Sequence, residues 1–291
     1  MRSLSRHVTA RFVPSIAVAL FTFLTGYSAA QTTTTPPTTP LAAPAPAPVA
    51  STNNTYSSSG FSFTTAPTPT WVELAGVSAG ISTDTAPDAP IKILLLDYQT
   101  KLYPAPQVNY NRVAYKLQTI AAMQQTSELT IRFNPEYQTL TLHTLNVVRK
   151  GSKQNRLKPD AIKLLQREED MDQALYDGTV TALVVLDDIQ VGDIIDYSYS
   201  ITGANPVFAN NFVTQFGLGF SSSIARVRHR IITPTGRTLN ARSVAGDFNP
   251  VVSTKGGYRE YLWDQRNTTA LEYEDGAPAW HDQTPYVSVS E

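Results

Sequence analysis

The stretch Val184–Ser200, VVLDDIQVGDIIDYSYS, decides the fold of this chain. In its second half, apolar or aromatic residues alternate with polar ones: Ile195, Tyr197 and Tyr199 against Asp196, Ser198 and Ser200. A period of two residues predicts a half-buried β-strand over residues 193–201. We therefore expect Asp196 to point toward solvent.

The same stretch gathers carboxylates, which could hold a metal ion or perform acid/base chemistry. They are Asp187, Asp188, Asp193 and Asp196. A calcium loop needs oxygen ligands at alternate positions and a closing bidentate acid, and neither is present. Glycine at 192 tolerates positive φ, and aspartate bonds nearby backbone amides, so the pattern favours a turn at 191–193 before this strand and another at Asp187-Asp188, where the preceding strand ends. A weak cation site is the alternative.

Other segments show the same alternation. Residues 111–119 (NRVAYKLQT) and 128–133 (ELTIRF) predict two strands that pair as a hairpin across a loop at 120–127. In residues 137–152 the apolar phase changes near His143, which predicts a β-bulge or a crossing between sheets.

The pattern of the remaining segments predicts an all-β fold. Further strands are expected at 179–186, 224–232 and 257–264, and one helix at 158–175, where Pro159 suits a first helical position. Eight to ten short strands separated by Gly, Pro and Asp turns favour an antiparallel β-sandwich over residues 71–291.

The N-terminus predicts export. Residues 1–30 combine early arginines, an apolar stretch and small residues before Gln31, as in a cleaved signal peptide. An uncleaved anchor is the alternative, and only then would the chain contact a membrane. Residues 31–70 are rich in Thr, Pro and Ala and nearly free of charge, which is typical of a disordered linker. We expect a periplasmic or secreted bacterial protein.

Composition excludes several functions. The 291 residues carry a net charge of −1, which gives no reason to expect nucleic-acid binding. The sequence contains no cysteine. Disulfides, thiolate metal sites and a catalytic thiol are therefore excluded.

Two kinds of residue invite a catalytic interpretation. Residues 76–80, GVSAG, match the G-x-S-x-G pattern around Ser78, but the following ISTDTAPDAP cannot begin the helix that a nucleophile elbow requires. His143, His229 and His281 show no metal-ligand spacing, and His229 shares its phase with apolar neighbours, so it should pack inward. We predict no catalytic, metal or cofactor-binding residue and no cofactor.

One strand offers a candidate ligand face. Arg226, Arg228 and Arg230 share a phase, and such a row could receive an anion or a partner's carboxylates. The alternative is an outward face balanced by acids on a neighbouring strand.

Several ordered stretches resemble one family. They are FNPEYQTLTLHTLNVVRKG (133–151), ALYDG (174–178), LDDIQVGDIIDYSYSITGANPVF (186–208), YLWD (261–264) and PAWHDQTPYVSVSE (278–291). Together they resemble a domain of unknown function that precedes transglutaminase-like domains in exported bacterial proteins. The resemblance implies an immunoglobulin-like β-sandwich, with catalysis by Cys, His and Asp in the following papain-like domain. This chain has no cysteine, so no catalytic residue carries over.

The expected function is therefore a non-catalytic accessory or substrate-presenting module. Its expected partners are a transglutaminase-like domain, missing from this chain or separate, and an envelope peptide that could add to an edge strand. The alternatives are a hydrolase using Ser78 or a carboxylate pair, and a purely structural envelope protein. The chain could also be a fragment of a longer enzyme.

Overall fold

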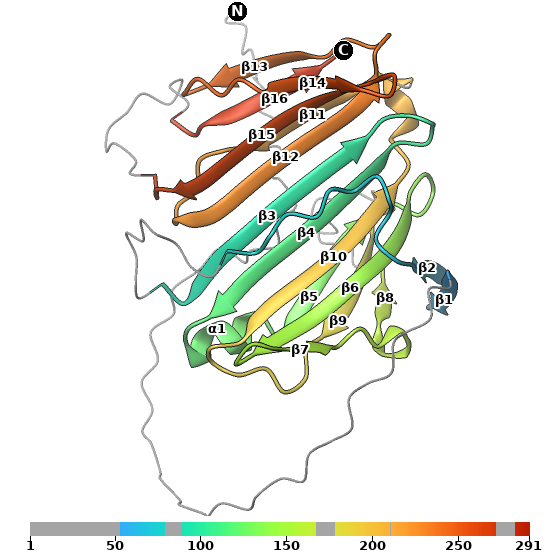
Figure 1. The fold of residues 1–291 in the computed structure, drawn as a ribbon. Helices are drawn as coiled ribbons and strands as arrows, with labels where there is room; N and C mark the ends of the chain where they lie inside the picture. Colours follow the sequence, from blue (N-terminus) through green and yellow to red (C-terminus); the bar gives the residue numbers. More distant parts are fainter. Residues whose placement is uncertain (1–52, 79–88, 167–177, 210, 272–282) are drawn as a thin grey trace, which may run out of the picture.

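The computed structural model describes residues 53–78, 89–166, 178–209, 211–271 and 283–291. One long sheet spans the molecule (Figure 1). Its strands, in spatial order, are β1 (Asn54–Ser58), β2 (Phe61–Thr65), β6 (Thr139–Arg149), β10 (Ile194–Thr202), β4 (Val108–Leu117), β3 (Ile91–Lys101), β12 (Ile224–Pro234), β15 (Tyr258–Thr268) and β14 (Val251–Lys255), and β7 (Ser152–Asn155) pairs with β6. The sheet is antiparallel except where β12 meets β3 and β2 meets β6.

Two small sheets complete the fold. One has the order β5 (Glu128–Phe133), β9 (Val180–Val185) and β8 (Lys163–Leu165), and the other β11 (Val213–Gly217), β16 (Tyr286–Ser290) and β13 (Asn240–Val244). The helix α1 covers Ile120–Gln125, with the Thr119 side chain as its N-cap. The all-β prediction is confirmed, and the layers are one long sheet with two short ones rather than two sheets of similar size.

Both small sheets cover the same face of the long sheet. The first cluster of buried side chains joins Leu145 and Ile195 of the long sheet to the β5–β9–β8 sheet. The second joins Val227 and Trp263 to the β11–β16–β13 sheet. Val113 of β4 packs against both clusters, so the two cores are neighbours on one face.

The strand phases predicted from sequence are confirmed at several points. The register between β10 and β6 shifts between Ser198 and Tyr199, which leaves His143 as the extra residue of a β-bulge. Gly192 has φ of +96°, as the predicted turn requires. His229 is buried between the rings of Tyr98 and Phe216, whose centroids lie 4.9 and 3.9 Å from its own.

Three predictions about local structure are wrong. Residues 111–119 and 128–133 do not form a hairpin, because β4 pairs with β10 and β3 while β5 pairs with β9. The predicted helix at 158–175 is a short 3-10 turn, Pro159–Ala161, followed by β8; residues 167–177 lie outside the described residues. The predicted linker does not reach residue 70, since β1 and β2 already pair within it, and Phe63 is buried in the first core.

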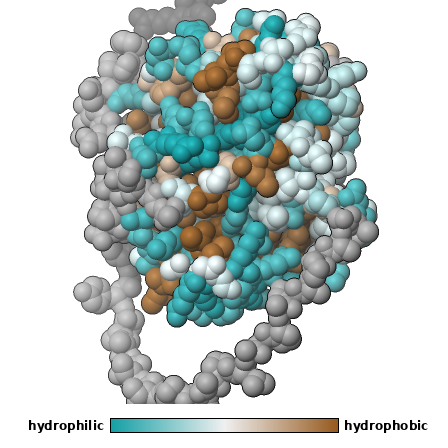
Figure 2. All heavy atoms as spheres, in the orientation of Figure 1, coloured by the Kyte–Doolittle hydropathy of each residue, from teal (hydrophilic) through white to brown (hydrophobic). Residues whose placement is uncertain are grey.

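The described residues contain no helix long and apolar enough to cross a membrane. Figure 2 shows the face opposite the small sheets as mostly hydrophilic, with separate apolar patches. The predicted signal peptide lies outside the described residues, as does His281.

Replacing Ile195 with alanine should destabilise the fold strongly. Its side chain is fully buried in the first core, so the substitution should cost about 2–5 kcal/mol in the free energy of unfolding, measured by urea denaturation. The matched control is Ile120→Ala, because Ile120 is 68% exposed. A similar loss in both variants would contradict the core described above.

His229 should make the fold sensitive to acid. Burial lowers the pKa of His229 to about 3, while an unfolded histidine titrates near its ordinary value of 6.5. Below pH 6.5 this histidine is protonated in the unfolded chain but stays neutral in the folded chain. The free energy of unfolding should therefore fall as the pH drops. At about pH 4.5 this contribution is on the order of 3 kcal/mol. His229→Phe should lose stability less steeply between pH 7 and 4.5 than the wild type, and equal slopes would sink the prediction.

Candidate functional site: a covered arginine face

The second face of the long sheet carries a row of polar residues that runs across six strands. In cross-strand order the row is Asp264 (β15), Arg228 (β12), Asp97 (β3), Arg112 (β4), Ser198 (β10) and Thr144 (β6). All six residues share the phase opposite to the apolar cores, so their side chains leave the sheet on the same side. Without a covering segment, this polar face would be exposed to solvent.

A segment of the chain lies over this face. We call residues 66–77, which connect β2 toward β3, the strap. In Figure 1 the strap passes in front of β10, β4 and β3, on the side away from β5, β8 and β9. Asp97 and Arg228 are consequently almost fully buried, although they belong to the polar face.

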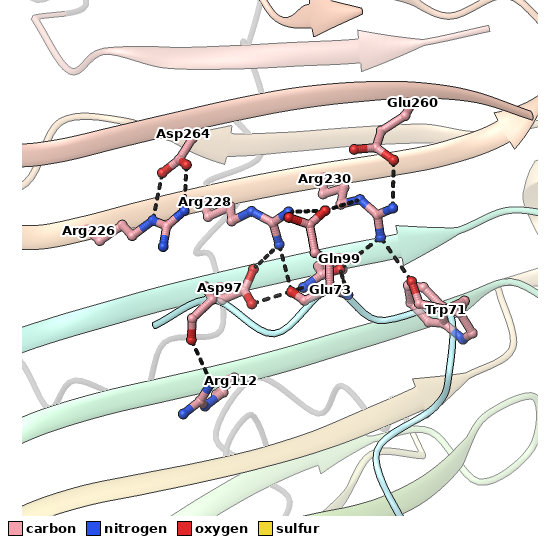
Figure 3. Close-up of polar contacts among 11 residues, drawn as sticks. Trp71, Glu73, Asp97, Gln99, Arg112, Arg226, Arg228, Arg230, Glu260 and Asp264 are labelled. Carbon is pink, nitrogen blue, oxygen red and sulfur yellow. Dashed lines mark hydrogen bonds and ion pairs between the residues drawn. The ribbon is translucent and has the colours of Figure 1, made fainter. Parts of the chain in front are cut away.

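The sheet holds the strap through its backbone (Figure 3). Three arginines donate to alternate carbonyls: Arg230 Nη1 to Trp71 O at 3.0 Å, Arg228 Nη1 to Glu73 O at 3.0 Å and Arg112 Nη1 to Ala75 O at 2.9 Å. Gln99 adds a two-point contact, donating from Nε2 to Glu73 O at 2.8 Å and accepting from Glu73 N at 3.1 Å. Carbonyls at every second residue facing one side are the pattern of an extended chain.

Carboxylates of the sheet orient these donors. We call Asp97, Gln99, Arg112, Arg228 and Arg230 the arginine face. Both oxygens of Asp196 accept from Arg112, at 2.8 Å each. Arg230 Nη2 donates to Glu260 at 2.6 Å, and Asp97 accepts from Arg228 at 3.3 Å and Gln99 at 2.9 Å. Each of the four donor side chains, Gln99, Arg112, Arg228 and Arg230, therefore has a partner in the sheet and a partner in the strap.

The environment shifts the pKa values of two acids in opposite directions. Burial raises the pKa of Asp97, and the positive charge of Arg228 opposes that rise. The hydrogen bond from Arg230 lowers the pKa of Glu260. The hydrogen bond from Arg230 therefore favours the charged form of Glu260, whereas burial opposes the charged form of Asp97.

The predicted arginine ladder lies within this site, and its members differ. Arg226 forms a fork with Asp264 of β15, at 2.8 and 2.6 Å. Arg230 is also balanced by an acid of β15, as the alternative interpretation expected, whereas Arg228 pairs with Asp97 of β3. An incoming anion would have to compete with these carboxylates.

The acids of the stretch 187–196 form ion pairs with basic side chains, and Asp188 and Asp193 share Arg149. Asp188 has φ of +52° and pairs with Arg149 and Arg156, and Arg149 lowers its pKa. Asp193 is buried and forks with Arg149 at 2.9 Å to each oxygen. The prediction that Asp196 points to solvent is wrong: it is 7% exposed because the strap covers its face of the sheet. Among the described residues no group of His, Asp or Glu is arranged to hold a metal ion.

Sequence reasoning missed one serine–histidine contact. His143 Nε2 lies 2.8 Å from Ser200 Oγ, and His143 Nδ1 lies 3.0 Å from Ala66 O of the strap. Ser200 is 2% exposed, and burial lowers the pKa of His143. The pair therefore ties the strap to the sheet. Ser78, the candidate nucleophile, lies at the edge of the described residues, and the segment 79–88 that follows it lies outside them.

Sequence analysis also missed the strap, because its first five residues, 66–70, fall within the predicted linker. Complementary charge could have indicated a polar layer here. Asp97 and Gln99 of β3 leave the sheet on the same side as Arg112 of β4 and Arg228 of β12, the two strands that flank β3.

Removing Arg112 should cost far more stability than removing Arg226. Arg112→Met leaves the buried Asp196 without its partner, a loss of about 3–5 kcal/mol. Arg226→Met frees Asp264, whose side chain is 23% exposed, and should cost about 1 kcal/mol or less. Urea denaturation of both variants tests this prediction. Equal losses in the free energy of unfolding would show that the strap does not bury the Arg112–Asp196 pair.

Comparison with known proteins places the fold. A crystal structure of a "putative protease" from Parabacteroides distasonis ATCC 8503 is similar, with a TM-score of 0.60 and 21% identity over 69% of this chain and 40% of that one. Two further structures, aminopeptidase A from Legionella pneumophila and LTA4 hydrolase from yeast, match with TM-scores of only 0.37 and 0.31. Their identities are 12% and 10%, and they cover 69% and 74% of this chain and 21% and 31% of their own.

No curated protein sequence matches the chain. The family described as a domain of unknown function with solved structure, DUF3857, matches residues 105–272, which is more than half of the sequence and includes most of the long sheet. This chain belongs to the DUF3857 family.

Proposed function

We propose that this domain is a non-catalytic module of an exported bacterial envelope protein. It binds an extended peptide and presents it to a transglutaminase-like or peptidase-like catalytic partner. One observation carries the proposal: the arginine face holds an extended segment through the carbonyls of Trp71, Glu73 and Ala75. Contacts to backbone atoms recognise a peptide by its shape rather than its sequence.

The state of the reactive side chains supports a binding role. Asp188, Asp193 and Asp196 are each paired with an arginine, and the hydroxyl of Ser200 is enclosed beneath the strap. A general acid or base must reach the substrate proton within hydrogen-bonding distance, and these groups are turned toward the protein itself.

The similar structure supports a larger assembly. The present chain spans 40% of the "putative protease", so that protein has room for a further domain beside the shared fold. An accessory module with a catalytic neighbour fits this length. The transglutaminase-like character of the neighbour comes from the family resemblance of the sequence.

The outer edge of β14 offers a second route for peptide binding. The strand pairs only with β15 within the described residues, and all five of its residues are exposed, including Val251 and Val252. An unpaired edge can accept an added strand through main-chain hydrogen bonds.

Calorimetric titration of the full chain tests the proposal. The ligands are envelope peptides, peptidoglycan fragments and a separately supplied transglutaminase-like domain, and at least one should bind. Two variants assign the surface: Arg230→Met disturbs the arginine face, and Val252→Lys places a charge on the β14 edge. If none of the ligands binds the wild type, the proposed function is wrong.

A further inference from the structure

Two buried N–H groups of the arginine face lack a hydrogen bond. They are Nη2 of Arg228 and Nε of Arg230, which form no hydrogen bond of normal geometry within the described residues. A buried donor left without an acceptor costs about 1–3 kcal/mol, and more on a charged group. The nearest acid is Glu73 of the strap, whose Oε2 lies 3.0 Å from Arg228 Nη2 and 3.8 Å from Arg230 Nε.

Glu73 fills the space between these two groups only loosely. Its side chain is 64% exposed, whereas those of Arg228 and Arg230 are 2% and 11% exposed. A well-seated carboxylate accepts two parallel N–H bonds, as Asp264 does from Arg226. Arg228 and Arg230 therefore present the donors for a carboxylate that Glu73 does not fully satisfy.

The strap is attached mainly by its backbone. Of its central residues only Ala75 is buried, and Leu74 is 63% exposed. Ala75 and Val77 pack against Leu94, Leu95 and Ala114, so the apolar contact of the strap is confined to one small cluster near its C-terminal end. Segments with few buried apolar contacts open at low free-energy cost. The same carbonyl contacts would form with any extended peptide.

We propose that the arginine face is a binding site for an extended acidic peptide, and that the strap occupies this site in cis until such a peptide displaces it. The ligand's carbonyls would take the places of those of Trp71, Glu73 and Ala75, and its carboxylate would lie between Arg228 Nη2 and Arg230 Nε. This inference rests on the proposed function and names its ligand class and its site.

Competition by the strap sets the affinity that can be measured. A tethered segment acts at an effective concentration that can reach the millimolar range, so a free peptide binds only to the fraction of molecules whose site is open. Weakening the strap's carboxylate contact should enlarge that fraction.

The test uses two fluorescein-labelled peptides on the full chain. One is PTWVELAGV, the sequence of residues 69–77, and the other carries Gln in place of its Glu. Fluorescence anisotropy should show that the Glu73→Gln protein binds the acidic peptide about tenfold more tightly than the wild type does. It should also prefer the acidic peptide to the Gln peptide by about tenfold.

Two further substitutions in the Glu73→Gln protein locate the site. Arg230→Met should abolish the preference for the acidic peptide, whereas the matched control Arg226→Met should keep it, because Arg226 is satisfied by Asp264. Circular dichroism verifies folding. If Arg230→Met does not fold, the comparison of the two peptides on the Glu73→Gln protein decides the question by itself.

Each remaining outcome counts against the inference. Equal binding of the two peptides would eliminate the carboxylate site, and a preference that survives Arg230→Met would place it elsewhere. If neither peptide binds but envelope peptides do, the inference fails and the proposed function stands. If neither kind of ligand binds, both fail.

Discussion

Arg112 and Arg228 carry positive charge into the middle of a sheet face that is closed to water, and the rest of that face is arranged around them. A buried guanidinium group is stable only when carboxylates and carbonyls occupy its donors. Asp196 and Asp97 supply the carboxylates from neighbouring strands, and the strap supplies the carbonyls. The strap is therefore more than a connection between β2 and β3: it completes the hydrogen bonding of the face beneath it.

The two faces of the long sheet are built on different principles. One face buries apolar side chains against two short sheets, and its stability comes from close packing. The other buries charges beneath a single irregular segment, and its stability depends on complete pairing. Nη2 of Arg228 and Nε of Arg230 stand out for that reason, because Glu73 meets them as ion pairs and not as hydrogen bonds of normal geometry.

A face that holds a peptide backbone by side-chain donors is arranged to bind an extended segment. Its donors are fixed by acids before the segment arrives, so little order is lost on binding. The domain therefore combines a rigid, apolar half with a polar half that can exchange its occupant.

The sequence by itself determined the features that depend on near neighbours: the strand phases, the bulge at His143, the turn at Gly192 and the inward position of His229. The alternation of side chains is a local property of a strand, so these predictions needed no knowledge of pairing. The row of arginines at 226, 228 and 230 was predicted in the same way, but the strap that covers part of it was not. Only the tertiary structure decided that Asp196 is buried, that β4 does not pair with β5, and that Arg228 meets Glu73, 155 residues away. Such contacts depend on which distant segments come together, and the alternation of residues within one strand carries no information about that.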